Sequence, residues 1–185
     1  MRAFLSIHLS EIVQTRVEQL QSQLAAELPG VRWTRPANCH LTLKFFGDID
    51  SSIENAIAAR LPALVEQFSP FTVEFKGVGQ FPPRGPLSVL WVGVDCGAAA
   101  LVALENAVRE ALDVASIKFD AKPFKPHLTI GRAPHGRKIY LRSQQKYAAW
   151  SVGTMNIDGI SLMQSVLDPH GAIYTERQRF AFAPQ

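Results

Sequence analysis

The sequence carries one four-residue pattern twice, because His40-Leu41-Thr42-Leu43 recurs as His127-Leu128-Thr129-Ile130. The second copy begins 87 residues after the first (127 − 40). In an extended strand alternate side chains share a face, so the histidine and threonine of each copy point together while the aliphatic residues face a core. Each copy therefore offers an imidazole beside a hydroxyl, and two such copies indicate one shared site.

Other segments recur at the same offset, which indicates a duplicated fold. Residues 3–7 map onto residues 90–94, and each is a short apolar stretch followed by helical spacing. The segment 82–86, Pro-Pro-Arg-Gly-Pro, is the most breaker-rich in the chain and falls between the copies. We therefore expect a single domain over residues 1–185, made of two lobes at approximately 1–84 and 85–185.

Hydrophobic periodicity predicts alternating strands and helices. The expected helices begin at Glu11, span about residues 52–67 with a kink or break at Pro62, and span residues 98–112, with a further short helix from about residue 141. The expected strands cover residues 2–9, 40–46, 71–81, 88–94, 127–132, 154–165 and 172–182. This order predicts an α+β protein with two pseudo-twofold lobes, each a mostly antiparallel sheet with helices on its outer face, and a central cleft that carries both His-x-Thr patterns.

Positive charge is concentrated around the second pattern. The net charge is only +3, but residues 118–146 hold eight lysines and arginines against Asp120, so this segment carries +7 and the rest of the chain −4. A basic segment of this kind attracts a polyanion such as RNA. A solvated basic face is the alternative interpretation.

The sequence shows no feature of an exported or membrane-bound protein. Cys39 and Cys96 have neither metal-ligand nor Cys-x-x-Cys spacing, and two thiols are too few to staple a chain of 185 residues. No apolar run reaches the length of a membrane span or resembles a signal peptide. We expect a cytoplasmic monomer without a membrane partner.

Two histidines that face one substrate can act as a base and an acid, because the imidazole pKa lies near neutrality. A phosphodiester suits the pair, with Thr42 and Thr129 donating to its non-bridging oxygens. This chemistry leaves open which histidine is the acid. Alternation places Lys44 on the face of His40 and Thr42, where it is expected to contact the phosphate. Arg132 lies where its strand should end, so its direction stays open.

Two other chemistries find less support. Neither pattern contains a carboxylate and the chain has no His-Glu-x-x-His sequence, so neither a metal nor another cofactor is expected. Cys39 precedes His40 and should point to the opposite, buried face, so it is not expected to act as a nucleophile. The alternative from another class is a non-catalytic RNA-end-binding protein whose histidines only contact the terminal phosphate.

The two patterns and their surroundings resemble the 2H phosphoesterase superfamily, and more closely the RNA 2′,3′-cyclic phosphodiesterases, historically called 2′-5′ RNA ligases. The similarity includes residues 40–47 (HLTLKFFG), 126–132 (PHLTIGR), Phe81-Pro82 before residues 90–94, and residues 165–174. The resemblance implies metal-free hydrolysis of a terminal 2′,3′-cyclic phosphate on RNA or an oligonucleotide to a 2′-phosphate. Joining of tRNA halves through a 2′-5′ linkage is the alternative it implies.

The resemblance also assigns roles to residues of this chain. It implies that His40 is the proton donor and His127 the proton acceptor, with Thr42 and Thr129 as phosphate ligands and Arg132 as a further phosphate contact. The chain departs modestly from the family, with Gly131 where a small or aliphatic residue is usual and an extra histidine at His170.

Overall fold

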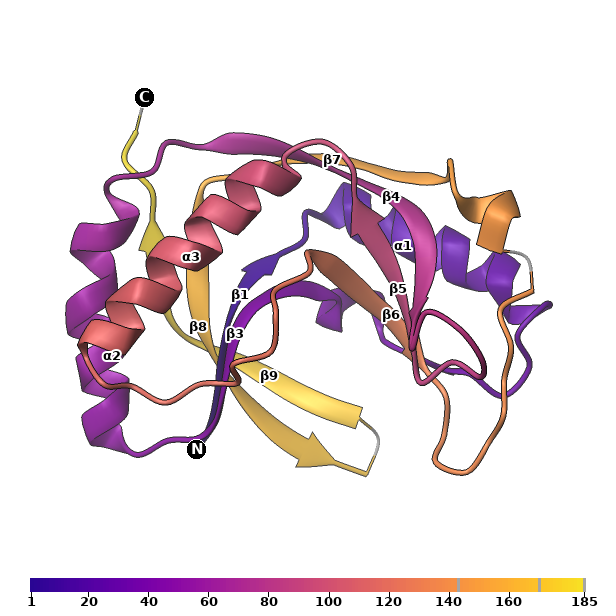
Figure 1. Cartoon of the computed structure of the whole chain (residues 1–185), viewed down its shortest axis with the longest axis horizontal. Helices are drawn as coiled ribbons and strands as arrows, with labels where there is room; N and C mark the ends of the chain where they lie inside the picture. The colour runs from indigo at the N-terminus through magenta and orange to yellow at the C-terminus, as the bar shows by residue number, and fades with distance from the viewer. Residues whose placement is uncertain (143, 170, 185) are drawn as a thin grey trace.

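The computed structural model describes residues 1–142, 144–169 and 171–184, so His170 lies outside the described residues. Within these ranges the chain forms three α-helices and one nine-stranded sheet whose neighbouring strands are all antiparallel (Figure 1). The α+β prediction is therefore confirmed. None of the described helices is both long and apolar enough to cross a membrane.

The elements follow one another along the chain with short connections. The helices are α1 Glu11–Ala25, α2 Ser51–Val65 and α3 Ala98–Val114, with 3-10 turns at Pro36–Asn38 and Gln144–Tyr147. The strands are β1 Arg2–His8, β2 Arg32–Trp33, β3 His40–Asp48, β4 Phe71–Phe81, β5 Val89–Val94, β6 His127–Arg132, β7 Ser151–Ile157, β8 Gly159–Asp168 and β9 Gly171–Ala181. Their order across the sheet is β7-β4-β5-β6-β3-β1-β8-β9, and β2 pairs with β6.

The two strands that carry the His-x-Thr patterns are neighbours at the centre of the sheet. β3 pairs with β6 through Leu41 and Leu128, which are again 87 residues apart (128 − 41). β1 flanks β3 and β5 flanks β6, as the offset between residues 3–7 and 90–94 predicts. Because β3 and β6 are adjacent, the two patterns lie side by side in one continuous sheet.

The two halves of this sheet are not the two halves of the chain. β4 precedes residue 84 but pairs with β5, whereas β8 follows it and pairs with β1. The expected boundary near residue 84 therefore does not divide the sheet, because each half of the sheet takes strands from both sides of it.

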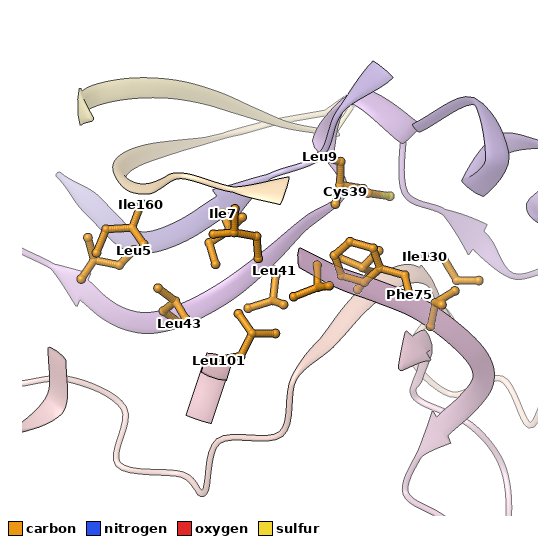
Figure 2. Packing of buried hydrophobic residues seen from close by; sticks show 14 of the residues in the cluster. Leu5, Ile7, Leu9, Cys39, Leu41, Leu43, Phe75, Leu101, Ile130 and Ile160 are labelled. Carbon is orange, nitrogen blue, oxygen red and sulfur yellow. The ribbon is translucent and has the colours of Figure 1, made fainter. Parts of the chain in front are cut away.

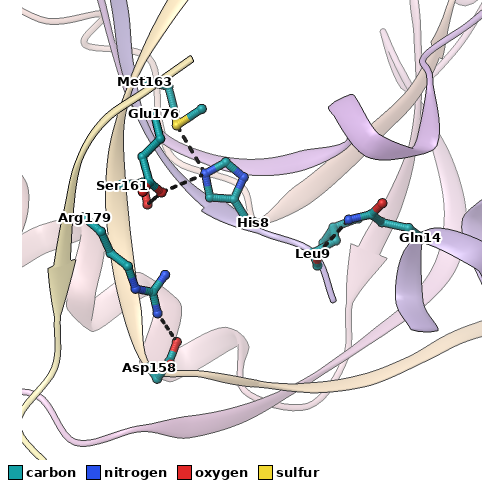
Figure 3. Close-up of polar contacts among 8 residues, drawn as sticks. All are labelled: His8, Leu9, Gln14, Asp158, Ser161, Met163, Glu176 and Arg179. Carbon is teal, nitrogen blue, oxygen red and sulfur yellow. Dashed lines mark hydrogen bonds and ion pairs between the residues drawn. The ribbon is translucent and has the colours of Figure 1, made fainter. Parts of the chain in front are cut away.

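The strand expected over residues 154–165 is in fact two strands that lie in different halves of the sheet. β7 ends at Ile157 beside β4, and β8 begins at Gly159 and runs beside β1. A side chain at Gly159 would come within 2.5 Å of the Phe180 carbonyl oxygen, so the chain crosses over at a residue without one. At the same crossing Asp158 accepts a hydrogen bond of 2.6 Å from Arg179 (Figure 3).

The core lies between the sheet and the helices. Strand residues that alternate with the polar pattern residues, such as Leu41 and Ile130, meet Leu101 of α3 in a single cluster of buried side chains (Figure 2). α1 contacts β7, while α2 and α3 contact each other and α3 contacts β3. The helices thus cover the face of the sheet that carries the aliphatic residues, and the histidines and threonines lie on the opposite face.

The helix ends follow from local side chains. The Ser10 hydroxyl accepts a hydrogen bond from the Val13 amide at the start of α1, and Asp50 caps α2 in the same way through the Ile53 amide. The kink or break expected at Pro62 does not interrupt α2, because the buried residues Leu61 and Val65 keep the last turn against the core. The short helix expected from residue 141 is a 3-10 turn that begins at Gln144.

Candidate active site

The four pattern residues line one cleft on the open face of the sheet. His40 and Thr42 from β3 and His127 and Thr129 from β6 all border a cavity of about 460 Å³. Alternation along each strand directs the histidine and threonine together, and the β3–β6 pairing brings the two strands side by side. The structure therefore brings together the residues that the repeated pattern singled out.

Each histidine ring is oriented by a backbone carbonyl two residues before it. His40 Nδ1 lies 2.8 Å from the Asn38 carbonyl oxygen, and His127 Nδ1 lies 2.6 Å from that of Lys125. A carbonyl oxygen only accepts, so Nδ1 carries the hydrogen in both rings. Nε2 of each ring is left to exchange a proton with a substrate.

Aromatic side chains hold both rings in place. Phe4 stacks on His40 with ring centroids 4.7 Å apart, and the Tyr174 ring meets His40 edge-on at 5.2 Å. Phe81 meets His127 edge-on at 5.1 Å, and Trp91 lies 6.3 Å away. Packing of this kind reduces the rotation of both imidazoles and limits the directions in which each Nε2 can point.

Burial lowers the pKa of both histidines in the free protein. The pKa of His40 falls to about 4, mainly because burial disfavours the charged ring, and the positive charges of His8, Arg132 and His127 lower it further. The pKa of His127 is also lowered, first by burial and then by Arg132 and Lys125. Both rings are therefore mostly neutral near pH 7 when nothing negative is bound.

His8 belongs to a polar cluster next to the cleft. It lies directly across from His40 in the β1–β3 ladder, and its Nε2 is 3.2 Å from Met163 Sδ and 3.6 Å from Glu176 (Figure 3). Ser161 donates a hydrogen bond of 2.7 Å to the same carboxylate. A cation on the His8 ring would thus be partly balanced by Glu176.

The charge lining the cleft is positive. Arg2 and Arg132 both border it, and no aspartate or glutamate is among the described residues that do. Arg132, whose direction the sequence left open, borders the cavity that also holds both histidines. Two guanidinium groups without a facing carboxylate suit an anionic substrate such as a phosphate.

Lys44 does not lie where alternation placed it. In the β1–β3 ladder Leu5 is opposite Lys44 and Ser6 is opposite Thr42, so Leu43 is an extra residue in β3 and forms a β-bulge. The bulge turns Lys44 into the interior, where it is 4% exposed and pairs with Glu105 of α3. Phe45, not Lys44, borders the cleft. The expectation that Lys44 shares a face with His40 and Thr42 is therefore wrong.

Cys39 faces the core, as the sequence predicted. Its side chain is buried, and burial raises the pKa of the thiol to about 12. The thiol donates a weak hydrogen bond of 3.6 Å to the Thr129 carbonyl oxygen across the β3–β6 junction. Cys39 thus links the two central strands and stays protonated, which excludes it as the thiolate nucleophile that cysteine catalysis requires.

Sequence reasoning from the two patterns missed several residues that border the cleft: Arg2, Phe4, Thr34, Asn38, Phe45, Ser165, Leu167, Ala172 and Tyr174. Alternation along the first expected strand could have pointed to Arg2 and Phe4 once the offset was accepted. Tyr174 arrives with the β8–β9 hairpin, and Asn38 fastens that hairpin by donating a hydrogen bond of 2.9 Å to the Ala172 carbonyl oxygen. Only the strand order reveals this part of the wall.

A buried glutamine positions another wall residue. Gln21 of α1 donates hydrogen bonds to the carbonyl oxygens of Thr34, at 2.7 Å, and Ile130, at 2.9 Å. The Thr34 amide donates to the same Ile130 oxygen. Gln21 therefore ties the segment after β2 to the strand that carries the second pattern.

Within the described residues no group of three or more histidine, cysteine, aspartate and glutamate side chains could hold a metal ion. Metal independence itself stays a prediction, which a chelator tests.

Sequence comparison finds relatives over almost the whole chain. The model of the 2′-5′ RNA ligase superfamily matches residues 10–169. A protein of Archaeoglobus fulgidus named RNA 2′,3′-cyclic phosphodiesterase is 33% identical over 180 residues, which cover 97% of this chain and 99% of the relative. A protein of Aquifex aeolicus with the same name is 32% identical over 181 residues, covering 97% and 96%.

Solved structures share the fold. The crystal structure of a Thermus thermophilus protein matches with a TM-score of 0.79 and 26% identity, covering 98% of this chain and 97% of that chain. The crystal structure of E. coli LigT complexed with 3′-AMP matches with a TM-score of 0.76 and covers 98% and 97%, at 22% identity. The likeness extends over all the elements that build the cleft.

Proposed function

Because the chain belongs to the 2′-5′ RNA ligase superfamily, we propose that it hydrolyses the terminal 2′,3′-cyclic phosphate of RNA or of an oligonucleotide to a 2′-phosphomonoester. The observation that carries the proposal is the pair of histidines, each with Nδ1 fixed by a carbonyl and Nε2 left free, over one cleft lined by arginines. The named relatives from Archaeoglobus and Aquifex support the substrate class.

In the proposed reaction His127 Nε2 takes a proton from water as the water oxygen bonds to phosphorus. The bond between phosphorus and the 3′ oxygen breaks, and His40 Nε2 gives its proton to that leaving oxygen. The phosphate stays on the 2′ oxygen. Thr42, Thr129 and Arg132 donate to the non-bridging oxygens, where negative charge is held during the displacement.

The low pKa of His40 sets a condition on its role as the acid. Since that pKa is about 4 in the free protein, the ring carries a proton at neutral pH only when a negative charge lies beside it. A bound cyclic phosphate is such a charge, so substrate binding and protonation of His40 would reinforce each other.

A comparison of two leaving groups tests which histidine is the acid. When sulfur replaces the 3′ oxygen of the substrate, this sulfur can leave phosphorus without being protonated. We expect His40→Ala to be nearly inactive on the normal cyclic phosphate and to regain turnover on the 3′-thio substrate, whereas His127→Ala stays inactive on both. If His127→Ala is the variant that is rescued, the roles are reversed.

The primary test measures release of a terminal 2′-phosphate from an oligoribonucleotide that ends in a 2′,3′-cyclic phosphate, with EDTA present. We expect turnover by the unmodified protein and near-complete loss in His40→Ala and His127→Ala. If RNA binds without turnover in the unmodified protein, the chain is an end-binding protein. If turnover needs an added metal ion, the metal-free mechanism is wrong.

The same geometry accommodates ligation when the 5′ hydroxyl of a second RNA replaces water. The attack then forms a 2′-5′ linkage, and the roles of the two histidines are unchanged. Including an RNA with a free 5′ hydroxyl in the assay and resolving joined from hydrolysed product measures the balance between the two reactions.

We also propose that residues 1–185 act as one unit built from two related halves. The offset of 87 residues relates the two histidines, the two threonines, the carbonyls of Asn38 and Lys125 that orient the rings, and the aromatic neighbours Phe4 and Trp91. A single cleft needs both halves, so the unit that we expect to bind RNA is the monomer.

A further inference from the structure

A second groove continues from the cleft. It has a volume of about 380 Å³ and shares with the cleft five wall residues: Thr34, Asn38, Arg132, Ala172 and Tyr174. It then extends past Arg32, Trp33 and Arg35 on one side and residues 133–135 on the other. A chain that leaves the cleft past Arg132 therefore enters this groove directly.

The groove is positively charged. Arg32 of β2 is directly opposite Arg132 of β6 in the ladder, and both side chains border the groove together with Arg35 and His135. Like charges that face each other across a ladder destabilise it unless an anion lies between them. No aspartate or glutamate is among the described residues that line the groove. This is the charge pattern of a phosphate-binding surface.

The two faces of β2 have different surroundings. Trp33 follows Arg32 and is directly opposite Gly131, and a side chain at Gly131 would come within 3.2 Å of the Trp33 ring and 2.7 Å of Val31. The indole therefore packs on the core side of β6, while Arg32 and Arg132 lie on the opposite face, beside the groove. This close approach gives a physical reason for a glycine at position 131.

We propose that this groove binds the single-stranded RNA that leads to the terminal phosphate, with Arg32 contacting a phosphate of the penultimate nucleotide. Sequence-independent binding of single strands commonly uses a positively charged groove that follows the backbone. The inference rests on the proposed function only for the identity of the end held between the two histidines. Binding in this groove makes the protein prefer RNA chains to mononucleotides as substrates.

The test compares two substrates and three proteins. A nucleoside 2′,3′-cyclic phosphate occupies only the cleft, whereas a tetranucleotide with the same end also reaches the groove. We expect Arg32→Gln to lower kcat/KM for the tetranucleotide about fivefold and to leave the mononucleotide rate unchanged. The slope of log(kcat/KM) against log salt for the tetranucleotide should fall by about 0.7, the share of one phosphate contact on a single strand. Arg60→Gln, on the exposed face of α2, is the charge-matched control and should leave kcat/KM unchanged for both substrates.

The inference is overturned if Arg32→Gln affects both substrates equally, or affects neither, or matches Arg60→Gln.

The outcome for the mononucleotide reports on the proposed function separately. If the unmodified protein turns over neither substrate, fluorescence anisotropy with a labelled tetranucleotide tests RNA binding in the groove independently of turnover. Equal affinity of the unmodified protein and Arg32→Gln for the tetranucleotide would then refute the role of the groove.

Discussion

Burial of His40 should make the stability of the fold depend on pH in a way that one substitution removes. The pKa of this imidazole is about 4 in the folded chain, against the ordinary value of 6.5 in an unfolded chain. Between these values the unfolded chain binds a proton that the folded chain does not. The free energy of unfolding therefore falls as the pH drops through 6.5, and the loss levels off below about 4.

The size of the effect follows from the shift. The difference between these two pKa values corresponds to about 3 kcal/mol when the full range is crossed, and most of it is lost by about pH 4.5. His40→Asn is the matched variant, because an amide nitrogen can still donate to the Asn38 carbonyl and carries no charge at any pH. Its constant effect on stability cancels when only the pH dependence is compared.

Urea denaturation of both proteins at several values between pH 7.5 and 4.5 provides the measurement. We expect the difference in unfolding free energy between the unmodified protein and His40→Asn to change by about 2 to 3 kcal/mol over this range. The unmodified protein should lose this stability at low pH, and His40→Asn should not. Parallel curves would show that the folded and unfolded pKa values of His40 are alike, and the argument from burial would then be wrong.

Three further predictions concern the rate, the interior and the wall of the cleft. The profile of kcat/KM should be bell-shaped with both limbs below pH 6.5, because burial lowers the pKa of both histidines in the cleft. The kcat profile should lie at higher pH, because bound phosphate raises both pKa values. A kcat/KM optimum above pH 7 contradicts this prediction. Lys44→Met should lower the unfolding free energy by about 3 kcal/mol and leave KM unchanged, because it leaves the buried Glu105 carboxylate without its partner. Adding Glu105→Leu should restore most of the lost stability, because it removes that unpaired charge. A raised KM in folded Lys44→Met would instead support a phosphate contact. Gly79→Ala should push the Trp91 ring away from β4, lower the melting temperature and reduce kcat, because that ring packs beside His127; unchanged tryptophan fluorescence and kcat would show that the ring has not moved.

The sequence was sufficient to predict that the two patterns border one cleft. The alternation of His40 and Thr42 with aliphatic residues holds in β3, and the matching alternation holds in β6. The offset of 87 residues also predicted that β1 and β5 occupy equivalent places beside them. These features depend on strand periodicity and on repetition, and both can be seen in the sequence without knowledge of the fold.

Lys44 shows where that periodicity failed. The alternation that placed it beside Thr42 assumes an unbroken ladder, and the bulge at Leu43 depends on the pairing with β1, which lies far away in the sequence. Helix α1 shows the same limit, because Ile12 fits the helical spacing yet is 74% exposed, while Gln21 is buried. Gln21 is buried because two carbonyl oxygens outside its helix accept its hydrogen bonds, which spacing cannot reveal.

The exchange of strands between the halves has a consequence for the order in which the cleft can form during synthesis. The ring of His40 is packed between Phe4, which is made before it, and Tyr174, which is made long after it. β1 can pair with β3 early in translation, but its other neighbour, β8, is made only after β6 and β7. A nascent chain therefore carries both histidines well before it has the wall around the first of them, so alignment of the His40 ring should wait until β8 and β9 have been made.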